Sequence, residues 1–121
     1  MPARIDRRLF CFSLAALAVA PTRFAAASPI IDALKGGGHV VAFRQGATTW
    51  SGIDRIEWPR ERQRLLSARG EEESRIIGAA FAHHDIPVGE GLASPFARCR
   101  DMAEIAFGRV EERMELLGLL S

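Results

Sequence analysis

Four residues in this sequence suit one chemical task, the holding of a phosphate-sized anion. Arg44 and Arg98 each offer a planar fork of donors that matches phosphate oxygens. Gly46 lets the backbone turn sharply and approach a ligand, and Thr48 adds a hydroxyl group. Together they predict a phosphate-binding site. A plainer interpretation also fits, because arginines near strand ends are often surface residues or ion-pair partners and short motifs match by chance.

Two strand ends are expected to bring these residues together. The near-continuous apolar run 39–43 predicts a strand buried on both faces, and Arg44 leaves its carboxyl end. A second short strand is expected around residues 91–93. Arg98 follows it, one turn into a helix whose free N-terminal amides favour an anion. Because ligands bind beyond the carboxyl ends of parallel strands, both segments should converge on one site.

Two helices are expected to follow these strands. Ser67 is placed to cap the first, which has acidic residues in its first turn and ends at residues 85–87. Its apolar residues recur at helical spacing and are Ile76, Ile77, Ala80 and Phe81. Ser94, followed by proline, is placed to cap the second helix, which would run to Phe107 and close at Gly108.

The order of the expected elements predicts the fold class. A short helix begins at Ser28-Pro29 and stops at a run of glycines, and a third strand begins near Val110. The alternation of strands and helices predicts an α/β fold, namely a partial three-layer αβα domain with a short parallel sheet and right-handed βαβ crossovers. Residues 46–64 form a long polar loop with two tryptophans, and loops of this length are often functional.

Three segments resemble the histidine phosphatase (phosphoglycerate mutase-like) superfamily. Residues 43–48 read Phe-Arg-Gln-Gly-Ala-Thr and are similar to the strand end where that family has Arg-His-Gly. Residues 65–81 are similar to its first helix, with the leading Leu-Ser-x-x-Gly, and residues 94–107 resemble its Ser-Pro-x-x-Arg segment. The resemblance spans roughly residues 29–110. It implies that Arg44 and Arg98 hold the positions of the two arginines that clamp phosphate.

The departures from that family bear on catalysis. Gln45 stands where the family has the histidine that attacks phosphorus, and a carboxamide nitrogen cannot carry a phosphoryl group because its lone pair is delocalised. Loss of such a nucleophile costs on the order of 10⁴-fold in rate. Met102 replaces a threonine of the pattern, and the family's acid/base carboxylate and second histidine have no counterpart before Ser121. No residue is therefore assigned a catalytic role.

Three functions remain open at this point. The first is an exported, catalytically impaired histidine phosphatase-like protein that keeps a site for phosphate or a small phosphomonoester. The second is an active phosphomonoesterase, either truncated in this sequence or using an unorthodox nucleophile. The third is a non-catalytic interaction module or degenerate fragment, for which an uncovered sheet edge predicts self-association.

Residues 1–27 are expected to be an export signal and residues 28–121 the truncated domain. An apolar run, 9–20, is too short for a stable membrane anchor and is followed by the small residues 25–27, after which cleavage is expected. Arg7-Arg8 also resembles a twin-arginine signal, so both export routes stay open. The mature chain is expected in the periplasm or outside the cell, without a membrane partner. The expected signal also begins with a positively charged stretch, which contains Arg4, Arg7 and Arg8.

Charge and composition exclude several other partners. Removing residues 1–27 takes away four arginines and one aspartate, so the 16 basic and 15 acidic residues become 12 and 14. This near-neutral balance gives no electrostatic case for nucleic acid. The mature chain keeps only Cys99 and therefore has no internal disulfide. No cofactor is expected. No metal is expected either, because His83 and His84 are adjacent on a helix and point about 100° apart.

Overall fold

The structure is a computed structural model that describes residues 28–118, and it has a mixed α/β fold. The three α-helices of this part are Pro29–Lys35 (α2), Ala68–His83 (α3) and Ala97–Phe107 (α4). Two short strands, Leu92–Ala93 (β1) and Glu111–Glu112 (β2), form a parallel sheet. Two 3₁₀ helices complete the elements, Arg60–Arg62 (η2) and Met114–Leu116 (η3). The expected export signal lies outside the described residues.

The chain divides into two compact units, Met1–Asp32 and Ala33–Ser121, and the boundary falls within α2. The backbone N–H of Asp32 donates to the Ser28 carbonyl over 3.1 Å, which is the first helical hydrogen bond. Gly37 and Gly38 follow the helix with φ of 72° and 76°, a conformation that glycine adopts without strain. The predicted first helix and its glycine stop are confirmed. No helix of residues 28–118 is long and apolar enough to span a membrane.

Helix α3 begins where Ser67 was predicted to cap it. The Ser67 hydroxyl accepts a hydrogen bond from the Gly70 N–H, so one of the free amides of the first turn is satisfied. The helix ends at His83, and Asp85 then turns the chain with φ of 53°. The backbone N–H of Ile86 donates to the Phe81 carbonyl and closes the last turn. Both predicted ends of this helix are confirmed.

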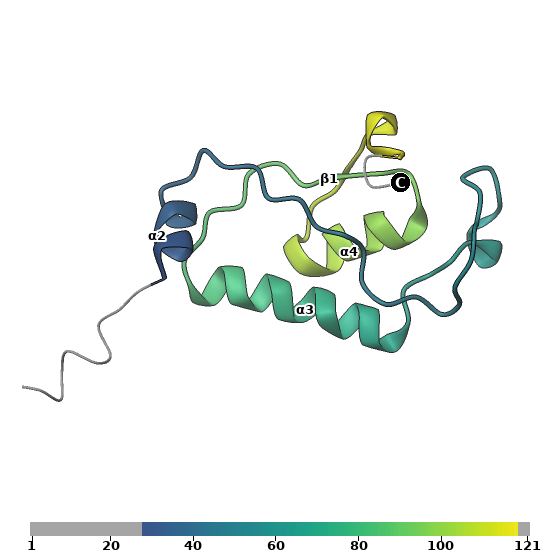
Figure 1. Ribbon diagram of the computed structural model, residues 1–121, viewed down its shortest axis with the longest axis horizontal. Coiled ribbons are helices and arrows are strands. Elements are labelled where there is room, and N and C mark those ends of the chain that lie inside the picture. The colour runs from purple at the N-terminus through teal and green to yellow at the C-terminus, as the bar shows by residue number, and fades with distance from the viewer. Residues whose placement is uncertain (1–27, 119–121) are drawn as a thin grey trace, which may run out of the picture. The chain divides into compact units, whose positions relative to one another are not determined.

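Helix α3 packs against α4, and Figure 1 shows α4 between α3 and β1. The closest approach is at Gly78, where an added Cβ would overlap the backbone carbonyl of Ala106. The rings of Phe81 and Phe107 meet edge to face with centroids 5.0 Å apart. The predicted apolar stripe is therefore only partly correct: Ile76 is 59% exposed. The face that meets α4 includes Gly78 as well as Phe81.

The predicted cap of α4 is wrong at its first residue. Phe96, and not Ser94, is the N-cap residue, and no side chain of the cap itself accepts a hydrogen bond. The side-chain oxygen of Gln63, from the preceding loop, accepts from the Ala97 N–H over 3.0 Å and satisfies that amide. A residue distant in sequence has thus taken the role that the serine pattern predicted. At the other end Gly108, with φ of 65°, closes the helix as expected.

Strands β1 and β2 lie parallel in the register Leu92 to Glu111 and Ala93 to Glu112. The Glu111 N–H donates to the Gly91 carbonyl over 2.7 Å, and the Arg113 N–H donates to the Ala93 carbonyl over 2.8 Å. The second and third predicted strands are confirmed. Helix α4 connects them, so this part of the chain is one strand–helix–strand unit.

The predicted strand at residues 39–43 is wrong. Within residues 28–118, no backbone N–H or C=O of residues 38–46 makes a hydrogen bond. Phe43 anchors the segment on the helices, with its ring centroid 6.0 Å from that of Phe81 and 6.1 Å from that of Phe107. Val40 is 98% exposed. The apolar composition was interpreted as burial between neighbours, but a strand also needs a hydrogen-bonding neighbour, and the described residues supply none.

Candidate functional site

Arg98, one of the two predicted phosphate ligands, is buried in an ion pair. Its NH1 nitrogen lies 3.0 Å and 2.8 Å from the two carboxylate oxygens of Asp54. Both residues are nearly inaccessible, with 9% of Arg98 and 8% of Asp54 exposed. The guanidinium carbon lies 4.2 Å from the ring centroid of Phe96, so an aromatic face covers the cation. Asp54 thus occupies the place where an anion would meet this arginine.

The pair with Asp54 uses only the NH1 nitrogen of Arg98. In a bidentate pair, two nitrogens of the guanidinium each face one carboxylate oxygen. Here a single nitrogen faces both oxygens, and the buried Nε has no hydrogen-bond partner within residues 28–118. A buried donor without a partner is uncommon in folded proteins and costs free energy. The site therefore has unsatisfied capacity for a further acceptor.

Thr48, the predicted hydroxyl ligand, belongs to the same polar network. Its Oγ1 donates to the Trp50 carbonyl over 2.9 Å and accepts from NH2 of Arg64 over 3.0 Å. The backbone N–H of Arg64 in turn donates to Asp54 Oδ2 over 2.9 Å. Thr48 and Arg98 are thereby linked through Arg64 and Asp54. The hydroxyl is engaged within the loop, and no direct contact joins it to Arg98.

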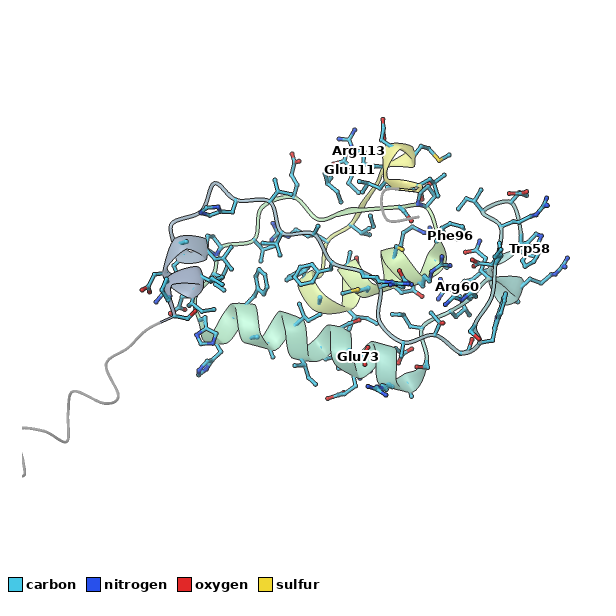
Figure 2. All side chains as sticks on the ribbon, in the orientation of Figure 1. Trp58, Arg60, Glu73, Phe96, Glu111 and Arg113 are labelled. Carbon is cyan, nitrogen blue, oxygen red and sulfur yellow. The ribbon has the colours of Figure 1, made fainter. Side chains whose placement is uncertain are left out.

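The loop that carries Asp54 is fastened to the start of α4 at two further places. Gln63 is buried, donates to the Trp58 carbonyl over 2.9 Å and accepts from the Ala97 N–H. Arg60 forms a two-point ion pair with Asp101 of α4, and this carboxylate raises the pKa of Arg60. Figure 2 labels the loop residues Trp58 and Arg60 at the same end of the view as Phe96, which precedes the helix. Loop and helix thus form one polar contact surface.

Arg44 and Gln45 lie on the unpaired segment. The Arg44 side chain is exposed and makes no hydrogen bond or ion pair within residues 28–118, so its guanidinium is free for a ligand. Gln45 is half-buried, and its side chain also has no hydrogen-bond partner in that part of the chain. No described interaction joins either residue to α4. The predicted convergence of the two arginines on one site therefore stays a prediction.

Gly46 lies against α3. A Cβ at Gly46 would come within 3.0 Å of the Gly70 carbonyl and of a Glu73 carboxylate oxygen. At Gly70 an added Cβ would overlap the Ala47 carbonyl, so both glycines are needed for the loop to cross the helix this closely. The close approach that was predicted toward a ligand is thus used, in this structure, for packing against the helix.

Glu73 fixes this crossing. Its carboxylate accepts from the Ala47 N–H over 3.0 Å and from Arg69 Nε over 3.0 Å. The hydrogen bond from the Ala47 amide, aided by Arg69, holds the pKa of the Glu73 carboxyl below its usual value of 4.5. The Ser67 backbone N–H and hydroxyl both donate to the Ala47 carbonyl. The turn after Arg44 is therefore held rigidly at the N-terminal end of α3.

Sequence reasoning missed the residues that organise this site. Asp54 was one of three acids in a polar loop, and its partner Arg98 is 44 positions away. Gln63 carried no motif. The available signal was chemical: a loop of this length needs internal hydrogen bonds, and its residues with both donors and acceptors are candidates to supply them. Nothing in the spacing selected Asp54 over the loop's other carboxylates.

Metal-binding geometry is not found in the described part of the chain. Within residues 28–118, no group of three or more histidine, cysteine, aspartate or glutamate side chains could hold a metal ion. The rings of His83 and His84 meet edge to face with centroids 4.9 Å apart at the end of α3. This is a contact between aromatic rings, and it brings no third ligand with it.

Comparison of this chain with protein-family models, with curated proteins and with solved structures gives no match. The resemblance to histidine phosphatases therefore rests on the three sequence segments alone.

Proposed function

We propose that this chain is a histidine phosphatase-like protein that binds phosphate or a small phosphomonoester through Arg44 and Arg98 and transfers no phosphoryl group. The observation that carries the proposal is the state of Arg98. Its guanidinium is buried at the start of a helix that follows a parallel strand, and its buried Nε lacks a partner among the described residues. This is the place where ligands bind in α/β folds.

Arg44 supplies the second cation in the proposal. It is exposed and has no ion-pair partner within residues 28–118. It also comes directly before the turn that Glu73 holds in place. A free guanidinium on a fixed backbone can meet an anion without first breaking an internal pair. Gly46 and Thr48 act through this turn: Gly46 lets the loop cross α3, and Thr48 holds the loop through Arg64.

The proposal includes binding without turnover because of Gln45. Its carboxamide can hydrogen-bond a phosphate oxygen but cannot form a phosphoryl intermediate. Export to the periplasm or cell exterior, by residues 1–27, belongs to the same proposal. So does the finer fold, a partial three-layer domain, in which the β1–α4–β2 crossover would be right-handed like nearly all such units.

Isothermal titration of the purified protein with inorganic phosphate and with phenyl phosphate tests the proposal. We expect saturable binding that is lost in Arg44→Ala, because the free cation is removed. Arg75→Ala is the matched control, since Arg75 is exposed and, among the described residues, pairs only with Glu71 and Glu72 of the same helix. Unchanged binding in Arg44→Ala would contradict the proposed site.

Arg98 needs a different variant. Arg98→Ala alone would leave Asp54 buried without its partner, which typically costs about 3–5 kcal/mol and risks unfolding. The double variant Asp54→Asn with Arg98→Gln removes both charges together. We expect it to fold and to lose phosphate binding. Wild-type affinity in this double variant would exclude Arg98 as a ligand.

A measurement of turnover distinguishes the proposed binding function from the alternative that the chain is an active phosphomonoesterase. We expect the wild-type protein to release no phosphate from phenyl phosphate and to acquire no covalent phosphoryl group. If the highly purified wild-type protein hydrolyses phenyl phosphate and Arg44→Ala does not, the chain is an active phosphomonoesterase. In Gln45→His, a covalent phosphoryl group would show that the pocket lacks only its nucleophile.

A second candidate function is self-association through residues 38–46. These residues present unpaired backbone groups and exposed apolar side chains, which is the surface that another strand covers. The occupant we propose is a second copy of the same segment in antiparallel orientation. Parallel in-register pairing would place Arg44 beside its own copy, whereas antiparallel pairing centred on Val41 places it opposite Gly38. Sedimentation velocity over a dilution series tests this candidate.

A further inference from the structure

We propose that Asp54 is a built-in competitor for the anion site. Its carboxylate holds Arg98 in the resting protein, and phosphate reaches Arg98 only when the middle of the loop 49–63 moves away with Asp54. This inference rests on the proposed phosphate-binding function and adds a mechanism that regulates it. The loop would then cover the site in the resting protein and change its conformation when phosphate binds.

The closed state is defined by three contacts around one guanidinium. Asp54 covers its NH1 edge with both carboxylate oxygens, at 3.0 Å and 2.8 Å. Phe96 covers one face at 4.2 Å. The side chain of Arg98 is 11% exposed and that of Asp54 is 3% exposed, so solvent hardly reaches either partner. An anion of phosphate size therefore cannot reach Arg98 while Asp54 stays in place.

The closed pair is a poor match for arginine. One nitrogen serves both oxygens, and Nε stays buried without an acceptor in the described part of the chain. A tetrahedral phosphate offers more oxygens in more directions than a planar carboxylate, so it can accept from Nε and from a terminal nitrogen together. Phosphate thus gains a hydrogen bond that Asp54 does not make. This difference gives the external ligand a means to displace the internal one.

The loop is also built so that Asp54 can leave. Asp54 sits between exposed neighbours, Ile53 and Arg55, and its other hydrogen bond in the described residues is accepted from the Arg64 N–H. Gln63 and Arg60 fasten the far end of the loop to α4 independently of Asp54. On the near side, the Arg64 side chain donates to the Trp50 and Gly52 carbonyls, also independently of Asp54. Release of Asp54 would therefore open only the segment around Asp54 while both ends of the loop stay attached.

The first test compares phosphate affinity in Asp54→Asn and in the wild type by isothermal titration. We expect at least about tenfold tighter binding in Asp54→Asn, because a carboxylate a few ångströms from the cation opposes a second anion by more than that factor. Glu57→Gln is the matched control. It removes one negative charge from the same loop, and Glu57 is exposed and, within residues 28–118, pairs only with Arg55, at 3.6 Å. We expect wild-type affinity there.

The outcomes separate this inference from the function it rests on. Tight binding in Asp54→Asn alone supports the competitor. Equal binding in Asp54→Asn and wild type overturns the competitor and leaves the proposed phosphate site standing. A similar gain in phosphate affinity in Glu57→Gln would mean that any loss of negative charge from the loop strengthens binding. That result also overturns the competitor. If neither the wild type nor folded Asp54→Asn binds phosphate, both the proposed site and the competitor are ruled out.

A second test uses the wild-type protein and does not depend on a variant that folds. Arg55 follows Asp54 directly and is exposed, so trypsin cleavage after it reports on the freedom of the loop. We expect saturating phosphate to accelerate this cleavage relative to cleavage after Arg75 in α3. Chloride at the same ionic strength is the control. Saturable phosphate binding with unchanged or slower cleavage after Arg55 would overturn the proposal.

Discussion

Glu73 illustrates how one carboxylate can hold together two segments that are distant in the sequence. Its hydrogen bond to the Ala47 amide spans 26 positions and fixes the turn that follows Arg44. Because that bond favours the charged form, the pKa of Glu73 is lower in the folded protein than its usual value of 4.5. A group with a depressed pKa stabilises the folded state above its unfolded pKa, and the contribution disappears as pH falls through the folded value.

This linkage predicts a pH-dependent difference between the wild type and Glu73→Gln. At pH 7 the variant should be less stable, since it loses the charge-assisted bonds to Ala47 and Arg69. Below pH 4.5 the difference should shrink, because the wild-type carboxylate becomes protonated there. Thermal melts of both proteins from pH 7 to pH 3 measure it. Glu72→Gln, an exposed change on the same helix, should show no such convergence.

The limits of sequence reasoning at the scale of residues are clear at Arg98. A helix after a strand was predicted around it from Ser-Pro spacing and strand order, and the structure has both, with Arg98 as the second residue of the helix and not one turn into it. Its partner could not be predicted, because a loop folds by side-chain hydrogen bonds that have no period. Asp54, Gln63 and Arg64 acquire their roles only when the loop meets α4.

At the scale of elements, α3 and α4 are held close by a glycine in the middle of a helix. Glycine usually destabilises a helix interior by about 0.5–1 kcal/mol relative to alanine. At Gly78 this cost is offset by the close approach of the Ala106 backbone, which a methyl group would block. The buried Ser74, one turn earlier on the same face, bonds to the Gly70 carbonyl over 2.8 Å and leaves no bulk at the contact.

Gly78→Ala should therefore destabilise the protein, against the usual sign for such a change in a helix. We expect a loss of about 1–3 kcal/mol in the free energy of unfolding, the usual cost of overpacking. Urea denaturation followed by circular dichroism measures it. Gly89→Ala is the control, because no atom lies near its added Cβ, and it should change stability by less than about 0.5 kcal/mol. A stabilised Gly78→Ala would contradict the close packing.

Element ends were predictable where a single residue determines them, and the long-range elements were not. The Ser67 cap and the Gly108 stop are local and were confirmed. The Ser94 cap failed because Gln63 competed for the same helix end. The strand at residues 39–43 failed because a strand is a property of a pair, and an apolar run determines only one member of that pair.

At the scale of the molecule, the described part buries little apolar surface. Within residues 28–118, the buried apolar side chains are Leu66, Ile86, Ala93, Ala97 and Met102. Large apolar side chains remain exposed on several elements, among them Val40, Ile53, Ile76, Leu92 and Met114. Single exposed apolar residues are ordinary, but Val40 lies in a segment whose backbone groups are also unpaired. The exposed apolar side chain and the unpaired backbone together make this segment a place where a partner strand could pair.

The antiparallel pairing of residues 38–46 between two copies predicts a concentration-dependent dimer. Val40→Lys should shift it to monomer, because lysine on a free strand edge opposes pairing. Val40 is 98% exposed, so this change should leave the fold of the single chain intact. Sedimentation velocity over a dilution series measures the shift. Ile76→Lys is the control, since it places the same charge on an exposed position of α3.

Two further variants separate backbone pairing from simple apolar contact. Val40→Pro removes the N–H that a partner strand would accept from, and it should abolish the dimer. Val40→Thr keeps a β-branched side chain and the N–H, and it should retain much of the dimer although it is more polar. If Val40→Thr loses the dimer as fully as Val40→Pro, apolar contact alone explains the association. If all three Val40 variants still dimerise, the contact lies elsewhere on the molecule.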